Sequence, residues 1–145
     1  MGPVIQGMPV VSGTAEGLAL VSSEPLSFWG GYDYHSGEII DRRHPLSGSV
    51  AVGCILAVPF SRGSSTTAAV LLEAARAGTA PAAIITTGPD SFFVLASIVA
   101  RELYGPEAAI PIVAVSREEF ARLRTGDRLR IEAEGRICVL NRPLA

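Results

Sequence analysis

The chain has 145 residues and a formal net charge of −2 at pH 7, with 48% hydrophobic and 18% charged residues. This length predicts one domain, residues 1–145, that can bury its own core, and the hydrophobic content excludes a disordered chain. Nucleic-acid binding is not expected, because the acidic balance offers no basic stripe. All twelve basic residues are arginines, which excludes mechanisms that need a lysine, such as a Schiff base or a P-loop.

The N-terminal third is rich in Gly, Pro and Ser and predicts strands and loops, with the clearest strand at 17–21. Residues 25–37 combine turn residues with aromatic side chains. An irregular segment of this length in a compact domain is usually functional or an interface. Phe28 and Trp29 in this segment are consistent with an interface, and equally with ordinary core.

From residue 50 onward, apolar runs alternate with segments of helical periodicity. Continuous apolar runs bounded by Gly or Pro are typical of strands buried on both faces, and spacings of three and four are typical of helices. The predicted buried strands are 50–58, 82–87 and 110–115, and the predicted helices are 64–76, 91–104 and a short one after residue 116. Two further strands, 128–134 and 137–140, are expected to pair as a hairpin.

Several residues mark the expected helix ends. Asp90 is a candidate N-cap of the second helix, and Gly78 a candidate C-cap of the first. Residues 116–119 have the Ser-x-x-Glu form of a capping box. Together these elements predict a mixed α/β fold, in which a mixed sheet or barrel-like β core carries two to three helices. An open Rossmann sheet is excluded, because the sequence has no GxGxxG motif.

Neither a membrane segment nor a metal site is expected. The N-terminus lacks the basic-then-apolar order of a signal peptide, and no apolar run reaches the length of about 18 residues that a membrane span needs. We therefore expect a cytoplasmic protein. Cys54 and Cys138 stand alone in apolar segments, outside any ligand spacing, so we expect buried thiols and no metal bound by this chain alone.

The turn from the first buried strand into the first helix carries the strongest functional signal. Ligands of α/β units bind beyond the carboxyl ends of parallel strands, where the N–H groups of the next helix are unpaired. Ser64 and Ser65 fall at that point. Gly63 allows close backbone approach, and Arg62 adds a forked cation beside the positive helix end. The alternative is that one serine merely caps the helix.

The turn also resembles a known motif. Residues 63–65, which lead into Ala68 and Ala69, are similar to the Gly-Ser-Ser-Arg motif of aconitase swivel domains, and the whole chain resembles the small subunit, or swivel domain, of the aconitase X family. The matching stretches are 17–21, 25–31, 37–41, 44–48, 62–65, 80–85, 100–105 and 125–127. The resemblance implies a swivelling β/β/α domain.

The resemblance implies a role for each residue of the turn. Ser64 corresponds to the serine that acts as the base, and Ser65 to the serine that contacts the substrate. Thr66 replaces the motif arginine that binds a carboxylate, so this contact is expected from Arg62 or from a partner. With Gly63, these residues form the expected substrate-binding turn.

The resemblance further implies a hydro-lyase that is active only together with a large subunit, in a heteromer that takes a small-molecule carboxylate. An iron–sulfur cluster or iron is expected on the large subunit, and no cofactor on this chain alone. The family contains cis-3-hydroxy-L-proline dehydratases and phosphomevalonate dehydratases. The lysine-free, alanine-rich composition favours the hydroxyproline substrate.

Two other interpretations compete with this one. Residues 97–105 also resemble the phosphohistidine domain of phosphoenolpyruvate-utilising enzymes, but Leu95 occupies the position of the phosphorylated histidine, which leaves only shared architecture. A regulatory or scaffold subunit would tolerate loss of both serine hydroxyls. His35 and His44 do not form a metal site by themselves, although His44 lies in one loop-rich stretch with Asp33 and Asp41, and these side chains are candidates for substrate contact.

Overall fold

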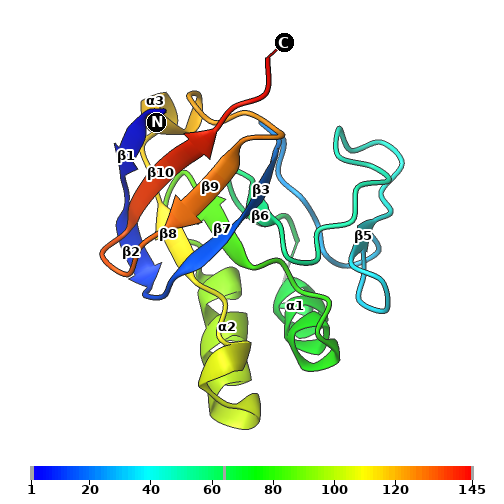
Figure 1. The fold of residues 1–145 in the computed structure, drawn as a ribbon. Coiled ribbons are helices and arrows are strands. Elements are labelled where there is room, and N and C mark those ends of the chain that lie inside the picture. The colour runs from blue at the N-terminus through cyan, green and yellow to red at the C-terminus, as the bar shows by residue number, and fades with distance from the viewer. Residues whose placement is uncertain (1, 64, 145) are drawn as a thin grey trace.

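The computed structural model describes residues 2–63 and 65–144. Figure 1 shows a curled sheet with two long helices side by side below it, a short helix above it, and a looped segment to one side. The elements are β1 Val4–Gln6, β2 Met8–Val11, β3 Ala15–Val21, β4 Tyr32–Asp33, β5 Glu38–Ile39, β6 Ile55–Ala57, α1 Thr66–Ala77, β7 Ala83–Thr86, α2 Ser91–Tyr104, the 3₁₀ helix η1 Pro106–Ala108, β8 Ile112–Ala114, α3 Arg117–Phe120, β9 Arg128–Ile131 and β10 Arg136–Asn141.

Eight strands form one sheet in the order β1-β10-β9-β3-β6-β7-β8-β2. The two outermost strands, β1 and β2, are consecutive in the chain and are separated only by Gly7, so the sheet curls into a barrel (Figure 1). Gly7 is required at this bend, because a Cβ there would lie 2.2 Å from a methyl group of Val113. The expected mixed, barrel-like sheet is confirmed.

Strand β3 joins the two halves of this sheet. Its first residues pair antiparallel with β9, and its last residues pair parallel with β6, where Ala19 faces Ile55. Strands β3, β6, β7 and β8 then continue as a parallel set. The carboxyl ends of these four strands therefore lie at one edge of the barrel.

Alternation along the parallel strands divides the hydrophobic core in two. In β6, Ile55 and Ala57 pack inside the barrel, while Leu56 faces the helices. In β7, Ile85 and Ile84 divide in the same way. Each strand is buried on both faces, which explains the continuous apolar runs in the sequence.

The helices largely follow their predicted bounds. Helix α1 ends at Gly78, whose φ of 77° lets its N–H reach the carbonyl groups of Ala74 and Ala75. Helix α2 spans the predicted residues, and Asp90 caps it. Ser116 accepts a bond from the Glu119 N–H, 3.1 Å away, but the Glu119 carboxylate binds Arg122 instead of completing the capping box.

The predicted strand 50–58 was wrong at its start. The strand begins at Ile55, and Val50 and Val52 are 53% and 42% exposed. Gly53 has a φ of 72°, which places a turn inside the apolar run. Cys138 is buried as expected, whereas Cys54, at the end of this turn, is only half-buried.

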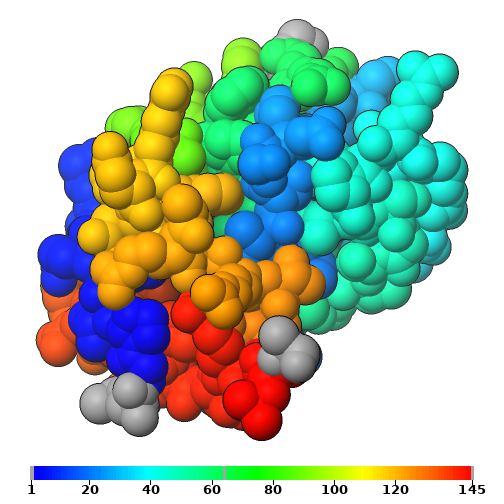
Figure 2. Space-filling view, turned by 90° about the horizontal axis from the view of Figure 1, so that it is seen from above, coloured from blue at the N-terminus to red at the C-terminus, as the bar shows by residue number. Residues whose placement is uncertain are grey.

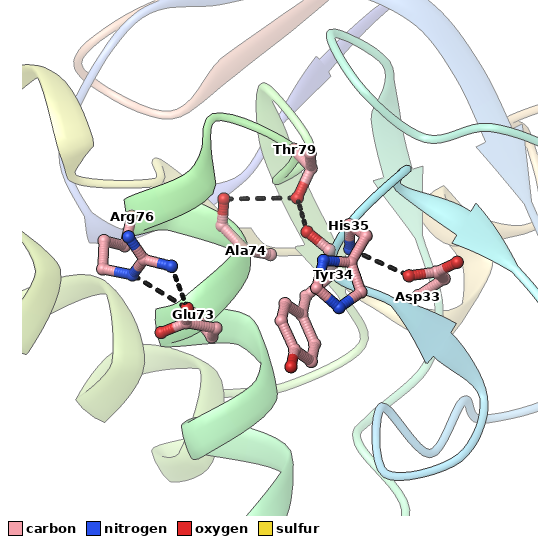
Figure 3. Close-up of polar contacts among 7 residues, drawn as sticks. All are labelled: Asp33, Tyr34, His35, Glu73, Ala74, Arg76 and Thr79. Carbon is pink, nitrogen blue, oxygen red and sulfur yellow. Dashed lines mark hydrogen bonds and ion pairs between the residues drawn. The ribbon is translucent and has the colours of Figure 1, made fainter.

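The segment between β3 and β6 is anchored to the C-terminal end of α1. The Tyr32 hydroxyl donates to the Thr79 carbonyl oxygen over 2.6 Å. The Thr79 hydroxyl donates to the Tyr34 carbonyl oxygen, also over 2.6 Å (Figure 3). Burial raises the pKa of the Tyr32 phenol, which keeps it a donor. Phe28 stacks on Tyr32 with ring centroids 4.7 Å apart, so this segment shares the helix-facing core.

Candidate functional site

The site lies at the carboxyl edge of the four parallel strands, which is where open α/β sheets bind ligands. Figure 2 looks onto this end of the molecule and shows the segments near residues 22–28 in blue, 59–63 in green and 115–122 in orange on the same face. These segments follow β3, β6 and β8 respectively. The serine turn predicted from the sequence is part of this edge.

The backbone of the turn is held at several points before it reaches the serines. The Arg62 N–H donates to the Leu26 carbonyl oxygen over 3.1 Å. The buried Thr67 hydroxyl donates back to the Arg62 carbonyl oxygen over 3.0 Å. Gly63 has a φ of 103°, and a Cβ there would lie 3.6 Å from the Ser27 hydroxyl oxygen. A glycine is therefore required at this position by its conformation.

Asp90 supplies the main support of the turn from the neighbouring strand end. Its carboxylate accepts the Ser61 N–H over 2.6 Å and the Ser61 hydroxyl over 2.8 Å, while also capping α2 through the N–H groups of Phe92 and Phe93. Asp90 itself is buried. One carboxylate thus fixes both the approach to the serine turn and the start of the next helix. The sequence identified Asp90 only as a cap.

The N-cap residue of α1 does not make the usual capping bond. Ser65 occupies the N-cap position with helical backbone angles, and its side chain makes no capping hydrogen bond. The first turn of α1 contains no acidic residue. Ser65 and Thr66 are exposed. The positive end of the helix dipole therefore faces the site without a carboxylate of its own, and Ser64 lies outside the described residues.

A cavity of about 440 Å³ opens beside the turn. Residues that follow each of the four parallel strands contribute to it, and two aromatic rings give it apolar walls. The lining residues are Ser23, Pro59, Phe60, Thr87, Arg117, Phe120 and Ala121. The sequence did not identify Arg117 as a candidate. Arg117 follows β8, and only the strand order of the folded sheet brings it into one cavity with residues that follow β3, β6 and β7.

Asp33 and His35 lie away from the start of α1. Figure 3 shows Asp33 and His35 beside the C-terminal half of α1, near Glu73. Since Glu73 lies eight residues beyond Ser65, the two regions are about 12 Å apart along the helix. The N–H of His35 donates to Asp33 over 2.8 Å and lowers the pKa of that carboxyl group.

His44 and Asp41 bind local backbone. Nδ1 of the buried His44 accepts the Leu46 N–H over 3.1 Å, and Nε2 lies 3.3 Å from the Glu24 carbonyl oxygen. Asp41 accepts the Arg43 N–H over 3.0 Å. Both side chains therefore stabilise turns of the segment between β3 and β6.

The sequence left open whether the aromatic residues Phe28 and Trp29 belong to the core or to an interface, and the structure places the two differently. Phe28 is fully buried and meets Phe93 edge-on, with ring centroids 5.6 Å apart. Trp29, the next residue, is 68% exposed. The Ser27 hydroxyl lies close to Gly63 and donates to the Trp29 carbonyl oxygen, so the backbone of Trp29 is near the serine turn.

The described residues do not offer a ligand set for a metal centre. No three His, Cys, Asp or Glu side chains within residues 2–63 and 65–144 are grouped closely enough to hold an ion. Cys54 lies in the turn before β6 and Cys138 lies in β10, and burial raises the pKa of the Cys54 thiol, which disfavours the thiolate that binds metals. Nor is any helix of the described chain long and apolar enough to cross a bilayer.

Known proteins share both the sequence pattern and the fold of this chain. Residues 4–139 match the family model of the aconitase X swivel domain. The chain belongs to this family. A crystal structure of Thermococcus kodakaraensis aconitase X in its holo form superimposes on this swivel domain with a TM-score of 0.85 and 30% identity, covering 97% of this chain and 100% of that one.

Relatives of this swivel domain have two different names. It is 45% identical over 128 residues to a cis-3-hydroxy-L-proline dehydratase of Pseudomonas aeruginosa, a match that covers 88% of this chain and 21% of that protein. It is 36% identical over 138 residues to a phosphomevalonate dehydratase small subunit of Thermococcus gammatolerans, covering 94% of this chain and 98% of that one. This chain thus spans about a fifth of the first relative.

Proposed function

We propose that this swivel domain is the small subunit of an aconitase X-type hydro-lyase that dehydrates cis-3-hydroxy-L-proline. The observation that carries the proposal is the serine turn, held rigidly by Asp90 and leading into a helix start that no side chain of the described residues caps. The choice of substrate is supported by the 45% identity to a dehydratase of this name, and by a second one, from Hypocrea jecorina, at 38%.

In this proposal, Ser64 removes the proton. A serine hydroxyl is a weak base, so its oxyanion needs donors and positive potential in a site that excludes water. N–H groups at the start of α1 supply these donors, and Arg62 adds a positive charge. Gly63 permits close approach of the substrate, while Ser65 and Thr66 bind it.

Loss of water removes a proton from one carbon and hydroxide from its neighbour, which leaves a double bond and one water molecule. This chain provides the base and part of the binding site. The iron or iron–sulfur centre that we expect belongs to the large subunit, because the described residues offer no ligand set for it. The active site then lies between the two chains, in a heteromer that we expect in the cytoplasm, with the exposed Trp29 at the shared edge.

A phosphomevalonate dehydratase small subunit is the second candidate. Its support is the group of relatives with that name, one of them 36% identical over 94% of this chain. Both candidates share the reaction type and the serine turn, and they differ only in the substrate.

The test combines this chain with its large subunit and assays both substrates for water loss by mass spectrometry. We expect turnover of cis-3-hydroxy-L-proline, and a loss of at least about a thousandfold in Ser64→Ala with the complex intact. Ser12→Ala, which removes a serine hydroxyl that donates to the Ala133 carbonyl oxygen at the opposite edge of the sheet, is the matched control and should retain activity. Turnover of phosphomevalonate alone would favour the second candidate, and an active Ser64→Ala complex would refute the serine base.

A further inference from the structure

The cavity beside the serine turn is lined by polar side chains from three other strand ends. Arg117 follows β8, Thr87 follows β7 and Ser23 follows β3, and all three line the cavity. None of its lining residues among the described part of the chain is acidic. The lining thus includes one guanidinium and two hydroxyl-bearing side chains, of which the Thr87 hydroxyl donates to the Pro59 carbonyl oxygen over 3.1 Å, and the other lining residues are apolar.

Arg117 has no carboxylate partner among residues 2–63 and 65–144, although seven other arginines of this part of the chain form ion pairs. Its guanidinium is thus available for a ligand. A planar guanidinium matches a carboxylate through two parallel hydrogen bonds. The rings of Phe60 and Phe120 beside it exclude water from part of the cavity and strengthen such a contact.

We propose that Arg117 binds the substrate carboxylate in this cavity, in place of the motif arginine that Thr66 replaces. This inference rests on the proposed function. Phe60, which lines the cavity, lies three residues before Gly63, a chain length of at most about 10 Å. A small organic acid held by Arg117 is therefore close to the serine turn.

Arg62 likewise has no ion pair among the described residues, and its side chain, like that of Arg117, is exposed. The two differ in position, because only Arg117 lines the cavity. The cavity also contains the rings of Phe60 and Phe120, and a charged hydrogen bond beside an apolar wall is worth more than one in open water. The carboxylate contact is therefore assigned to Arg117, and Arg62 retains its role beside the start of α1.

The first experiment measures kinetics of the reconstituted complex with cis-3-hydroxy-L-proline. Arg117→Gln should raise KM about tenfold or more, with kcat within about twofold of wild type. Arg122→Gln is the matched control, because it removes the same charge from the same surface segment and its ion pair with Glu119 is exposed. An unchanged KM in Arg117→Gln overturns the inference and leaves the proposed function intact.

The second experiment needs no turnover and so separates the two proposals. The ¹⁵N-labelled chain is titrated with sodium acetate, and with acetamide as the neutral analogue at equal ionic strength. Acetate should shift the amide signals of Arg117 and Thr87, acetamide should not, and Arg117→Gln should abolish the acetate effect while Arg122→Gln retains it. Equal shifts in Arg117→Gln refute the carboxylate site. A wild-type complex without turnover of either substrate would contradict only the proposed function.

Discussion

The two long helices begin at neighbouring points of one sheet edge, yet their first turns are built differently. Helix α2 follows β7 and begins with Asp90, whose carboxylate binds two N–H groups of the first turn. Helix α1 follows the adjacent strand β6 and begins with Ser65, whose hydroxyl makes no such bond. A capped helix start has satisfied donors of its first turn internally, whereas the Ser65 hydroxyl satisfies none of those at the start of α1.

The starts of α1 and α2 are also connected by hydrogen bonds. Asp90 binds Ser61 as well as its own helix, so the capped start holds the approach to the open one. Asp90 and Thr67 thus both support the backbone that leads into the start of α1. Four substitutions test this comparison, in order of decreasing expected effect.

Asp90→Ala should have the largest effect on stability. It leaves the N–H groups of Ser61, Phe92 and Phe93 without their carboxylate acceptor. We expect the free energy of unfolding to fall by about 2–4 kcal/mol, measured by urea denaturation. A loss below about 1 kcal/mol would show that Asp90 does not support this edge.

Asp90→Ser should separate the two functions of this carboxylate. A serine still caps α2 but is too short to reach Ser61, so we expect a loss of about 1–2 kcal/mol. Hydrogen exchange should become faster at the Ser61 amide and stay unchanged at the Phe93 amide. Equal acceleration at both amides would contradict a separate role in holding the turn.

Thr67→Val should weaken the turn from the other side. The hydroxyl of Thr67 is buried and donates to the Arg62 carbonyl oxygen. Valine has nearly the same shape and removes this bond, so we expect a loss of about 1 kcal/mol in the free energy of unfolding. Thr14→Val, a change at another threonine outside the site, provides a comparison for the substitution itself.

The smallest effect is expected where the cap is absent. Ser65→Ala should change the free energy of unfolding by less than about 0.5 kcal/mol, because its hydroxyl caps nothing. Ser116→Ala should cost about 1 kcal/mol, because that hydroxyl accepts the Glu119 N–H. Thermal unfolding of both variants checks the contrast. Equal losses would mean that Ser65 does cap α1.

Much of this architecture could be predicted from residue patterns. Strands β6, β7 and β8 are buried on both faces and therefore appear as apolar runs, and the periodicity of α1 and α2 gave their bounds within about two residues. Val50 and Val52 misled the prediction, because they are apolar yet exposed. The segments Val4–Gln6 and Met8–Val11 were not predicted as strands, since they are short and several of their residues are exposed.

The candidate site could be predicted only in part. The turn at residues 62–66 follows a local rule about strand ends and helix starts, so its place at the edge was found from the sequence. Arg117 and the bond from Asp90 to Ser61 depend on which strands are neighbours. That order is a long-range property, which no local pattern around Arg117 reveals.

The closure of the barrel has a consequence for how the protein folds. Strand β1 pairs with β10, where Val4 lies opposite Cys138. Strand β3 pairs with β9, which is more than a hundred residues later in the sequence. Such high contact order predicts slow folding. During synthesis, the edges of β1 and β3 remain unpaired, and open to wrong partners, until the hairpin of β9 and β10 leaves the ribosome.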